Sequence, residues 1–228
     1  MAHAPSLGLW AGELLDIPGL LCSPLMPPVR LGPGQGRPVI VFPGYLTGDI
    51  SSLRLRRSLN AAGYRARGWE LGQNKGARAD LLDRLTAKLA RVRADEGSKV
   101  ALVGWSLGGI YARELAKLVP DDVAMVVTLG SPFSGSARAN NAWRLYEWFN
   151  DHPVDNPPIA IDRPVKPPVP TYAVWSPRDG IVAPASARGE PGEADGSYEV
   201  RCRHLSLARS REGIEQVGRL LTDKWPAA

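Results

Sequence analysis

One serine in the chain stands where its hydroxyl could act as a nucleophile. Ser106 is the centre of Gly104-Trp105-Ser106-Leu107-Gly108, which directly follows the apolar run 100–103 and directly precedes a segment with a helical pattern. A turn this tight between a strand and a helix strains the backbone of the serine, and only small neighbours leave room for it. The motif predicts an exposed, nucleophilic serine, and a glycine-rich turn with a capping Ser106 is the simpler alternative.

A serine hydroxyl needs a base to take its proton, and the base needs an acid to orient it. Histidine occurs at three positions, His3, His152 and His204. His3 lies near the N-terminus, and His152 stands between Asp151 and Pro153 in a segment typical of a loop. His204 follows the last expected strand, at the carboxyl end where open α/β sheets bind ligands. His204 is therefore the predicted base.

The acid is expected between the serine and the histidine in chain order. Asp179 follows the expected strand 172–175 through the turn Ser176-Pro177-Arg178 and precedes Gly180. It could also be no more than a turn-forming Asp-Gly pair. Other aspartates in the interval are excluded because they precede a strand or lie in an insert: Asp121, Asp122, Asp155 and Asp162. The spacing predicts Ser106, His204 and Asp179 as a catalytic triad.

Acyl transfer also needs hydrogen-bond donors for the developing oxyanion. The backbone N–H of Leu107, the residue after the nucleophile, is one expected donor. The second is expected in the loop Phe42-Pro43-Gly44-Tyr45, where Gly44 permits a sharp turn and the N–H of Tyr45 can point inward. Pro43 is excluded because proline has no N–H. Leu107 and Tyr45 are therefore the predicted oxyanion hole.

The elements that would position these residues alternate along the chain. Strands are expected at 39–42, 64–71, 100–103, 123–129, 172–175 and 198–202, and helices at 53–62, 78–95, 107–118 and 211–225. Strands that alternate with helices of ten or more residues pair in parallel through crossover connections. The pattern predicts one α/β domain over residues 1–228, with a mostly parallel sheet of about six strands and helices on both faces.

Two segments depart from this alternation. Residues 1–36 form an N-terminal helical and loop extension, whose apolar part, 5–26, predicts a surface helix packed on the domain. A membrane-interface helix is the alternative, but such helices usually carry basic residues and none occurs before Arg30. Peripheral membrane contact by this segment stays open. Residues 134–170 are too long for an ordinary connection and predict a cap or lid over the site.

The expected cap contains an aromatic helix followed by seven prolines between 153 and 170. A helix over 140–150 would place Trp143, Tyr146 and Phe149 near one face. Together with Trp105 of the serine motif, these side chains are the predicted substrate contacts, for an apolar acyl or alcohol group. The alternative is that the rings form the small core of the cap itself.

Composition restricts the partners. The chain has 228 residues, 44% hydrophobic and 22% charged, with net charge +5, which excludes a disordered or disulfide-scaffold protein. Its basic residues are scattered among acids, so no nucleic-acid partner is expected. Cys22 and Cys202 have no metal-ligand spacing, and two buried thiols are expected rather than a disulfide. No secretory signal or membrane span is evident, which indicates a cytoplasmic protein. Neither a metal nor a cofactor is expected, and the oligomeric state stays open.

With these elements the sequence resembles the α/β-hydrolase superfamily, and within it the compact bacterial lipases and esterases. The likeness extends from Val39 to the end of the chain and is carried by the following segments: Phe42-Pro43-Gly44-Tyr45, the Gly-Trp-Ser-Leu-Gly-Gly elbow, Leu129-Gly130-Ser131-Pro132, Ser176-Pro177-Arg178-Asp179-Gly180 and His204. Lipases of this kind usually carry His-Gly where this chain has Pro43-Gly44, and two leading strands are not evident before Val39. The resemblance implies hydrolysis of a carboxylic ester through an acyl-enzyme.

Two other functions fit the same residues. An acyltransferase would use the same triad and would deliver the acyl group to an acceptor other than water. A catalytically silent binding protein on the same fold would be expected to lack one of Ser106, Asp179 or His204, and all three are present in order.

Overall fold

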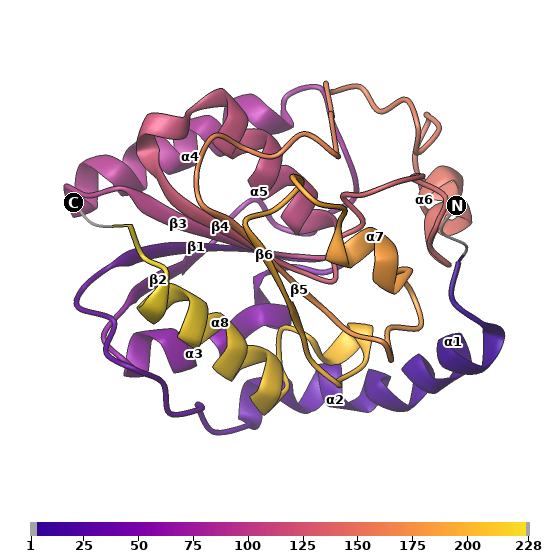
Figure 1. Cartoon of the computed structure of the whole chain (residues 1–228), viewed down its shortest axis with the longest axis horizontal. Helices are drawn as coiled ribbons and strands as arrows, with labels where there is room; N and C mark the ends of the chain where they lie inside the picture. Colours follow the sequence, from indigo (N-terminus) through magenta and orange to yellow (C-terminus); the bar gives the residue numbers. More distant parts are fainter. Residues whose placement is uncertain (1–3, 227–228) are drawn as a thin grey trace.

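Six strands form a single sheet in the computed structural model, which describes residues 4–226 (Figure 1). The strands are β1 (Pro38–Phe42), β2 (Arg65–Gly68), β3 (Val100–Trp105), β4 (Val123–Leu129), β5 (Thr171–Trp175) and β6 (Gly196–Glu199). They lie in the order β2-β1-β3-β4-β5-β6, and each pairs in parallel with its neighbours. The predicted parallel sheet of about six strands is confirmed.

Helices cover both faces of the sheet. The α-helices are α1 (Leu7–Glu13), α2 (Ile17–Cys22), α3 (Leu53–Ala61), α4 (Leu81–Glu96), α5 (Leu107–Leu118), α6 (Trp143–Phe149), α7 (Pro184–Arg188) and α8 (Arg211–Asp223). Short 3₁₀ helices are η1 (Leu14–Asp16), η2 (Ser23–Leu25), η3 (Asp49–Ser52), η4 (Pro120–Asp122) and η5 (His204–Ser206). Helices α3 and α8 lie on one face, and α4 and α5 on the other (Figure 1).

The side chains of β1 show how the strands divide the core. Val39 and Val41 pack in a buried cluster that includes residues of α3 and α8. Ile40 and Phe42 pack in a second cluster that includes residues of α4 and α5. Successive residues of a strand point to opposite faces, so a strand buried on both faces is apolar throughout. All of β1, β3 and β4 is buried, which explains their uninterrupted apolar sequences.

The six strands and the helices α3, α4, α5, α6 and α8 begin and end within three residues of the predicted bounds. The expected strand 64–71 ends at Gly68 because the chain then leaves the sheet. The Asp49 carboxylate accepts hydrogen bonds from the N–H groups of Trp69 (3.0 Å) and Glu70 (3.1 Å), and Glu70 has φ of 60°. These N–H groups therefore bond to a carboxylate and not to a neighbouring strand.

The helix expected from residue 140 begins later, at Trp143. Asn140 forms an isolated antiparallel bridge with Val182, and its Oδ1 accepts a hydrogen bond from the N–H of Ala142 at 2.8 Å. Its Nδ2 donates to the carbonyl of Ala137. A side chain that bonds its own neighbouring backbone competes with helical pairing, so the segment up to Ala142 stays extended or turned.

The N-terminal segment is a chain of short helices, α1, η1, α2 and η2, and not the single surface helix that was expected. Pro18 and Pro24 stand in the first turns of α2 and η2, where the missing N–H of proline costs nothing. Leu7, Leu15 and Leu25 are exposed, whereas Glu13 is buried. Within residues 4–226, no helix combines the length and the apolar character that crossing a lipid bilayer requires.

Both cysteines are free. Cys202 is half-buried, and its burial raises the pKa of the thiol to about 11. Cys22 is exposed, so the expectation of two buried thiols is wrong for this residue. The short helices of the N-terminal segment explain the difference, because α2 ends at Cys22 and turns its last residue toward solvent.

Candidate active site

The turn between β3 and α5 holds Ser106 in an unusual conformation, with φ of 54° and ψ of −124°. A Cβ atom on Gly104 would collide with the backbone of Gly109. A Cβ atom on Gly108 would lie 2.6 Å from the carbonyl oxygen of Pro43. Both glycines are therefore needed for the chain to turn so sharply. The strain at Ser106 is of the kind found at nucleophilic serines between a strand and a helix.

The carboxyl edge of the sheet gathers the residues predicted for catalysis. Ser106 follows β3, Asp179 follows β5, and His204 follows β6. Because these strands are parallel, their carboxyl ends meet at one edge of the sheet. The loops after them can therefore bring together residues that lie far apart in the sequence.

His204 lies between Ser106 and Asp179. Its Nδ1 is 2.7 Å from Asp179 Oδ2, and its Nε2 is 3.0 Å from Ser106 Oγ. A carboxylate can only accept, so the Nδ1–H of His204 donates to Asp179. The Nε2 lone pair then accepts the hydrogen bond of the Ser106 hydroxyl. The arrangement leaves the imidazole ready to take the serine proton.

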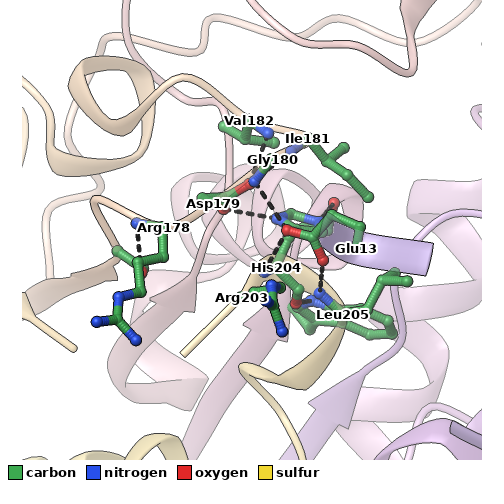
Figure 2. A network of polar contacts seen from close by, with 12 residues as sticks. Glu13, Arg178, Asp179, Gly180, Ile181, Val182, Arg203, His204 and Leu205 are labelled. Atoms are coloured by element: carbon green, nitrogen blue, oxygen red, sulfur yellow. Dashed lines mark hydrogen bonds and ion pairs between the residues drawn. The ribbon is translucent and has the colours of Figure 1, made fainter. Parts of the chain in front are cut away.

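Asp179 and His204 are almost fully buried, with 0% and 2% of their surface exposed. The second oxygen of Asp179 accepts from the N–H groups of Ile181 (2.9 Å) and Val182 (2.7 Å), as Figure 2 shows. These bonds hold the carboxylate in place. Burial opposes the charged imidazolium, but the charge of Asp179, its hydrogen bond to the ring and the charge of Glu13 outweigh it. Together they raise the pKa of His204 above its ordinary value.

Trp105 does not line the cavity beside Ser106, contrary to the prediction that it contacts substrate. It is the last residue of β3, and its side chain is buried on the α3 and α8 face of the sheet. Its indole N–H donates to the carbonyl of His204 at 3.1 Å, and the two rings lie 5.9 Å apart. Because side chains alternate along a strand, the Trp105 ring lies on the α3 and α8 face of the sheet and not in the cavity. From that face it packs against His204.

The two expected oxyanion donors lie beside Ser106. Leu107 is the first residue of α5, so its N–H has no acceptor within the helix. Tyr45 lines the same cavity as Ser106 and Leu107. Within the described part of the chain, no hydrogen bond is found for the N–H of Tyr45. Neither N–H group therefore has a hydrogen-bond acceptor among the described residues.

Sequence reasoning missed Asn74, which holds the loop that carries Tyr45. The side chain of Asn74 donates from Nδ2 to the carbonyl of Pro43 at 2.8 Å. Its backbone accepts from the N–H of Leu46 (2.7 Å) and donates to the carbonyl of Thr47 (2.8 Å). Asn74 is fully buried. The surrounding sequence, Gln73-Asn74-Lys75-Gly76, is typical of any polar turn, so it contains no signal for this role.

A cavity of about 90 Å³ is bordered by Ser106. Its wall is mainly apolar and aromatic, and it includes Ile110, Tyr111, Trp143 and Tyr146. Of the aromatic residues predicted in the insert, Trp143 and Tyr146 therefore border the same space as the serine. The Tyr146 hydroxyl accepts from the N–H of Ala77 at 3.2 Å, so this ring also connects the insert to the main domain.

Phe149 lies outside the cavity, contrary to the prediction. Its side chain is 59% exposed and stacks on Trp148, which is 81% exposed, with ring centroids 5.3 Å apart. Phe149 is the last residue of α6. Because a step of three residues turns a helix by only about 300°, Phe149 is displaced by about 120° around the axis from Trp143, and its ring turns to solvent.

The insert is held to α5 by a buried guanidinium. Arg113 donates to the carbonyls of Arg163 and Val165, both at 3.2 Å, and its guanidinium lies 4.2 Å from the centre of the Phe133 ring. Burial lowers the pKa of Arg113 to about 10. The group still keeps its charge near neutral pH, so the returning half of the insert is tied to α5, the helix that follows Ser106.

No cluster of three or more histidine, cysteine, aspartate or glutamate side chains that could hold a metal ion is found within residues 4–226. His152, the alternative histidine, is half-buried away from Ser106. Its Nε2 lies 3.3 Å from the carbonyl of Ala77, and its ring packs edge-on against Tyr146. His3 lies outside the described residues. Among the candidate histidines in the described part, His204 is the one that contacts Ser106.

No protein-family model matches the sequence, and no curated protein matches it. Solved structures are similar to it in three dimensions. A lipase from Bacillus licheniformis has a TM-score of 0.59 at 17% identity, over 88% of this chain and 96% of that one. A monoacylglycerol lipase from Paleococcus ferrophilus has a TM-score of 0.56 at 14% identity, over 85% and 95% of the two chains.

A third similar structure is an α/β-hydrolase enzyme from the metagenome of sediments of the Mar Chica lagoon in Morocco. It has a TM-score of 0.54 at 20% identity, over 84% of this chain and 91% of that one. The TM-scores of these three structures show a common fold, and at such low identity they show no more than that. What the chain does has to be argued from its own site.

Proposed function

We propose that this chain, which has the α/β-hydrolase fold predicted from its sequence, is a serine hydrolase that cleaves a carboxylic ester through Ser106, His204 and Asp179. The observation that carries the proposal is the continuous hydrogen-bonded series from Ser106 Oγ to His204 to Asp179, at 3.0 Å and 2.7 Å. The similar structures named as lipases support an ester as the substrate.

In the first half of the reaction, Ser106 Oγ attacks the carbonyl carbon of the ester while its proton passes to His204 Nε2. The carbonyl oxygen becomes an oxyanion, which accepts hydrogen bonds from the N–H groups of Leu107 and Tyr45. Asp179 stabilises the imidazolium that forms and keeps Nδ1 protonated. The imidazolium then gives its proton to the leaving alcohol oxygen as the carbon–oxygen bond breaks, and an acyl-enzyme remains.

Water completes the reaction. His204, neutral again, takes a proton from a water molecule as the water oxygen attacks the acyl carbon. A second oxyanion accepts from the same two N–H groups, and the imidazolium returns the proton to Ser106 Oγ as the acid leaves. The preorganised N–H donors lower the barrier most, because they meet the negative charge where it develops.

The walls of the cavity favour an apolar acyl or alcohol group. Ile110, Trp143 and the ring of Tyr146 give broad apolar contact next to Ser106. Removing such a group from water contributes about 25 cal/mol for each Å² buried. Because these apolar walls stand next to the reacting serine, esters with an apolar acyl or alcohol chain are the proposed substrates.

The proposal is tested with p-nitrophenyl esters of rising chain length and with a fluorophosphonate probe. The protein should hydrolyse the esters in repeated turnovers, and the probe should form one adduct that blocks hydrolysis. Hydrolysis that the probe does not block, or a folded protein that neither turns over esters nor accepts the probe, contradicts the proposed function. Added alcohol acceptors distinguish hydrolysis from acyl transfer by their products.

The pH dependence of kcat/KM should report the protonation of His204. The imidazole must be neutral to take the serine proton, so activity is expected to rise as the pH passes the pKa of His204. Because the neighbouring carboxylates raise this pKa, the rising limb should lie above about 6.5, the ordinary value for histidine. Initial rates at substrate concentrations far below KM measure it, and a limb below that value contradicts the assignment.

Shortening an aromatic wall residue should impair long substrates more than short ones. Trp143→Ala is expected to remove about 1–3 kcal/mol of transition-state stabilisation, as measured by kcat/KM, for a medium acyl chain. The loss for acetate should be smaller, because a longer chain loses more contact. Phe149→Ala serves as the matched control, since this ring lies on the same helix but points to solvent. Equal losses at every chain length with a lower melting temperature would show that Trp143 is structural.

A further inference from the structure

One buried carboxylate has no part in the reaction as described above. Glu13 is the last residue of α1 and is 2% exposed. Its Oε1 accepts from the N–H groups of Gly180 (2.8 Å) and His204 (2.9 Å), and its Oε2 accepts from the N–H of Leu205 (3.0 Å), as Figure 2 shows. A carboxylate that bonds three N–H groups from two loops holds both loops at fixed positions.

These N–H groups belong to the two catalytic loops. Gly180 directly follows the acid Asp179, and the other two donors are the base His204 and its neighbour. Within residues 4–226, no backbone hydrogen bond joins the loop 176–182 directly to the segment 203–206. The connections between them are the His204–Asp179 hydrogen bond and Glu13. Glu13 is thus a second bridge between acid and base.

Helix α1 also packs closely against the loop that carries Asp179. A Cβ atom on Gly180 would collide with the carbonyl oxygen of Leu9 in α1. The helix therefore lies directly against the loop of Asp179, and Gly180 leaves the space for it. This approach places the carboxylate at the end of α1 between the two loops.

The charged groups around Glu13 come from the N-terminal segment, from the loop after β5 and from the residues after β6. Asp16, on the same segment, forms ion pairs with Arg209 (3.0 Å) and Arg203 (3.5 Å). Arg178 points away from the carboxylate (Figure 2). The titratable groups that face it are His204 and, through the loop at Gly180, Asp179. The ion pairs of Asp16 neutralise part of the surrounding charge, but among the described residues Glu13 itself has no basic partner within salt-bridge distance.

We propose that Glu13 is a positioning residue that holds His204 against Asp179 and stabilises the imidazolium as Ser106 attacks. The inference rests on the proposed function, because it assigns Glu13 a part in the same reaction. The carboxylate acts in two ways. Its three hydrogen bonds set the distance between base and acid, and its negative charge lies close enough to the ring to favour the protonated form.

A simpler role would be to fasten the N-terminal segment to the domain. Other contacts already do so, since Asp16 bonds Arg209 and Asn141 donates to the carbonyl of Pro5. Asp16 is therefore the matched control. Asp16→Asn weakens the attachment of the same segment and leaves the carboxylate of Glu13 in place.

The test compares Glu13→Gln with Asp16→Asn in kcat/KM against pH. Glu13→Gln keeps the shape and one acceptor oxygen but loses the charge. We expect its plateau to fall about 10- to 100-fold, the range for one lost charge-assisted hydrogen bond. The rising limb should move to lower pH, since the pKa of His204 falls without the negative charge. Asp16→Asn should keep the limb where it is. An unmoved limb in Glu13→Gln, with or without a lower plateau, overturns the proposal.

Two further measurements separate this inference from the proposed function. Glu13→Asp, which keeps the charge, should hold the limb near its wild-type position. In the wild-type protein the amide hydrogens of Gly180, His204 and Leu205 should exchange slowly, and fast exchange would overturn the inference even if Glu13→Gln does not fold. If the wild-type protein neither hydrolyses esters nor accepts the fluorophosphonate, the proposed function fails. The imidazole titration of His204, followed by NMR, then still tests whether Glu13→Gln lowers the pKa of the ring.

Discussion

Ser106→Ala is expected to remove fluorophosphonate labelling completely and to lower kcat by about 10⁶-fold, the loss typical of a missing nucleophile in a triad. The hydroxyl faces a cavity and contributes little packing, so the melting temperature should stay close to that of the wild type. Mass spectrometry of the labelled protein locates the adduct, and calorimetry checks the fold. The remaining activity would come from the N–H groups of Leu107 and Tyr45 and from substrate binding.

Two other serines near the carboxyl edge provide the controls. Ser131 and Ser176 are both fully buried, and the Ser176 hydroxyl already accepts from the N–H of Arg178 at 3.0 Å. Neither is within hydrogen-bond distance of a histidine among the described residues. Ser131→Ala and Ser176→Ala should therefore keep the label. An adduct on either of them would refute the assignment of Ser106.

Ser106, the proposed nucleophile, could be identified as a candidate from the sequence because its signal is local. The glycines at 104 and 108 are needed for the turn at Ser106, so the geometry of the elbow is encoded in five consecutive residues. His204 and Asp179 could be proposed because each follows a recognisable strand, and parallel strands bring their carboxyl ends together. Their positions after parallel strands therefore indicate that His204 and Asp179 lie close together, although they are far apart in the sequence.

The role of Glu13 could not be predicted, because its partners lie 167 and 191 residues away. The N-terminal segment has no strand that would assign it to the carboxyl edge. One signal was present: Glu13 is one of two acids, with Asp16, in a largely apolar stretch, and a buried charge requires partners. The sequence does not say which backbone groups they are. The role of Asn74 could not be predicted for the same reason, because its hydrogen bonds to Pro43 and Thr47 depend on how two loops pack.

The predicted substrate contacts divided according to local detail. Trp143 and Tyr146 border the cavity, whereas Phe149 does not. Residues three apart drift by about 60° around a helix at each step, so Phe149 no longer shares the face of Trp143. Trp105 is adjacent to Ser106 in sequence, but side chains alternate along β3, and its ring lies behind His204.

His204→Ala is expected to lower kcat by about 10⁶-fold, as much as the loss of the nucleophile, since the serine proton then has no acceptor. The matched control is His152→Ala. His152 packs against Tyr146, which lines the cavity, but it makes no contact with Ser106. Its loss should therefore leave most of the activity. If His152→Ala lost its activity and His204→Ala kept it, His152 and not His204 would be the base.

Asp179→Asn should lower kcat by about 10⁴-fold, for a reason that the site makes explicit. Asparagine can still accept from the N–H groups of Ile181 and Val182, so the loop should fold as before. Its amide NH₂, however, would then face Nδ1 of His204 and donate to it. The ring proton would move to Nε2, which could no longer accept the proton of Ser106. Near-wild-type rates at neutral pH would show that Asp179 does not set the tautomer, whereas a large loss with an unchanged melting temperature is what this geometry requires.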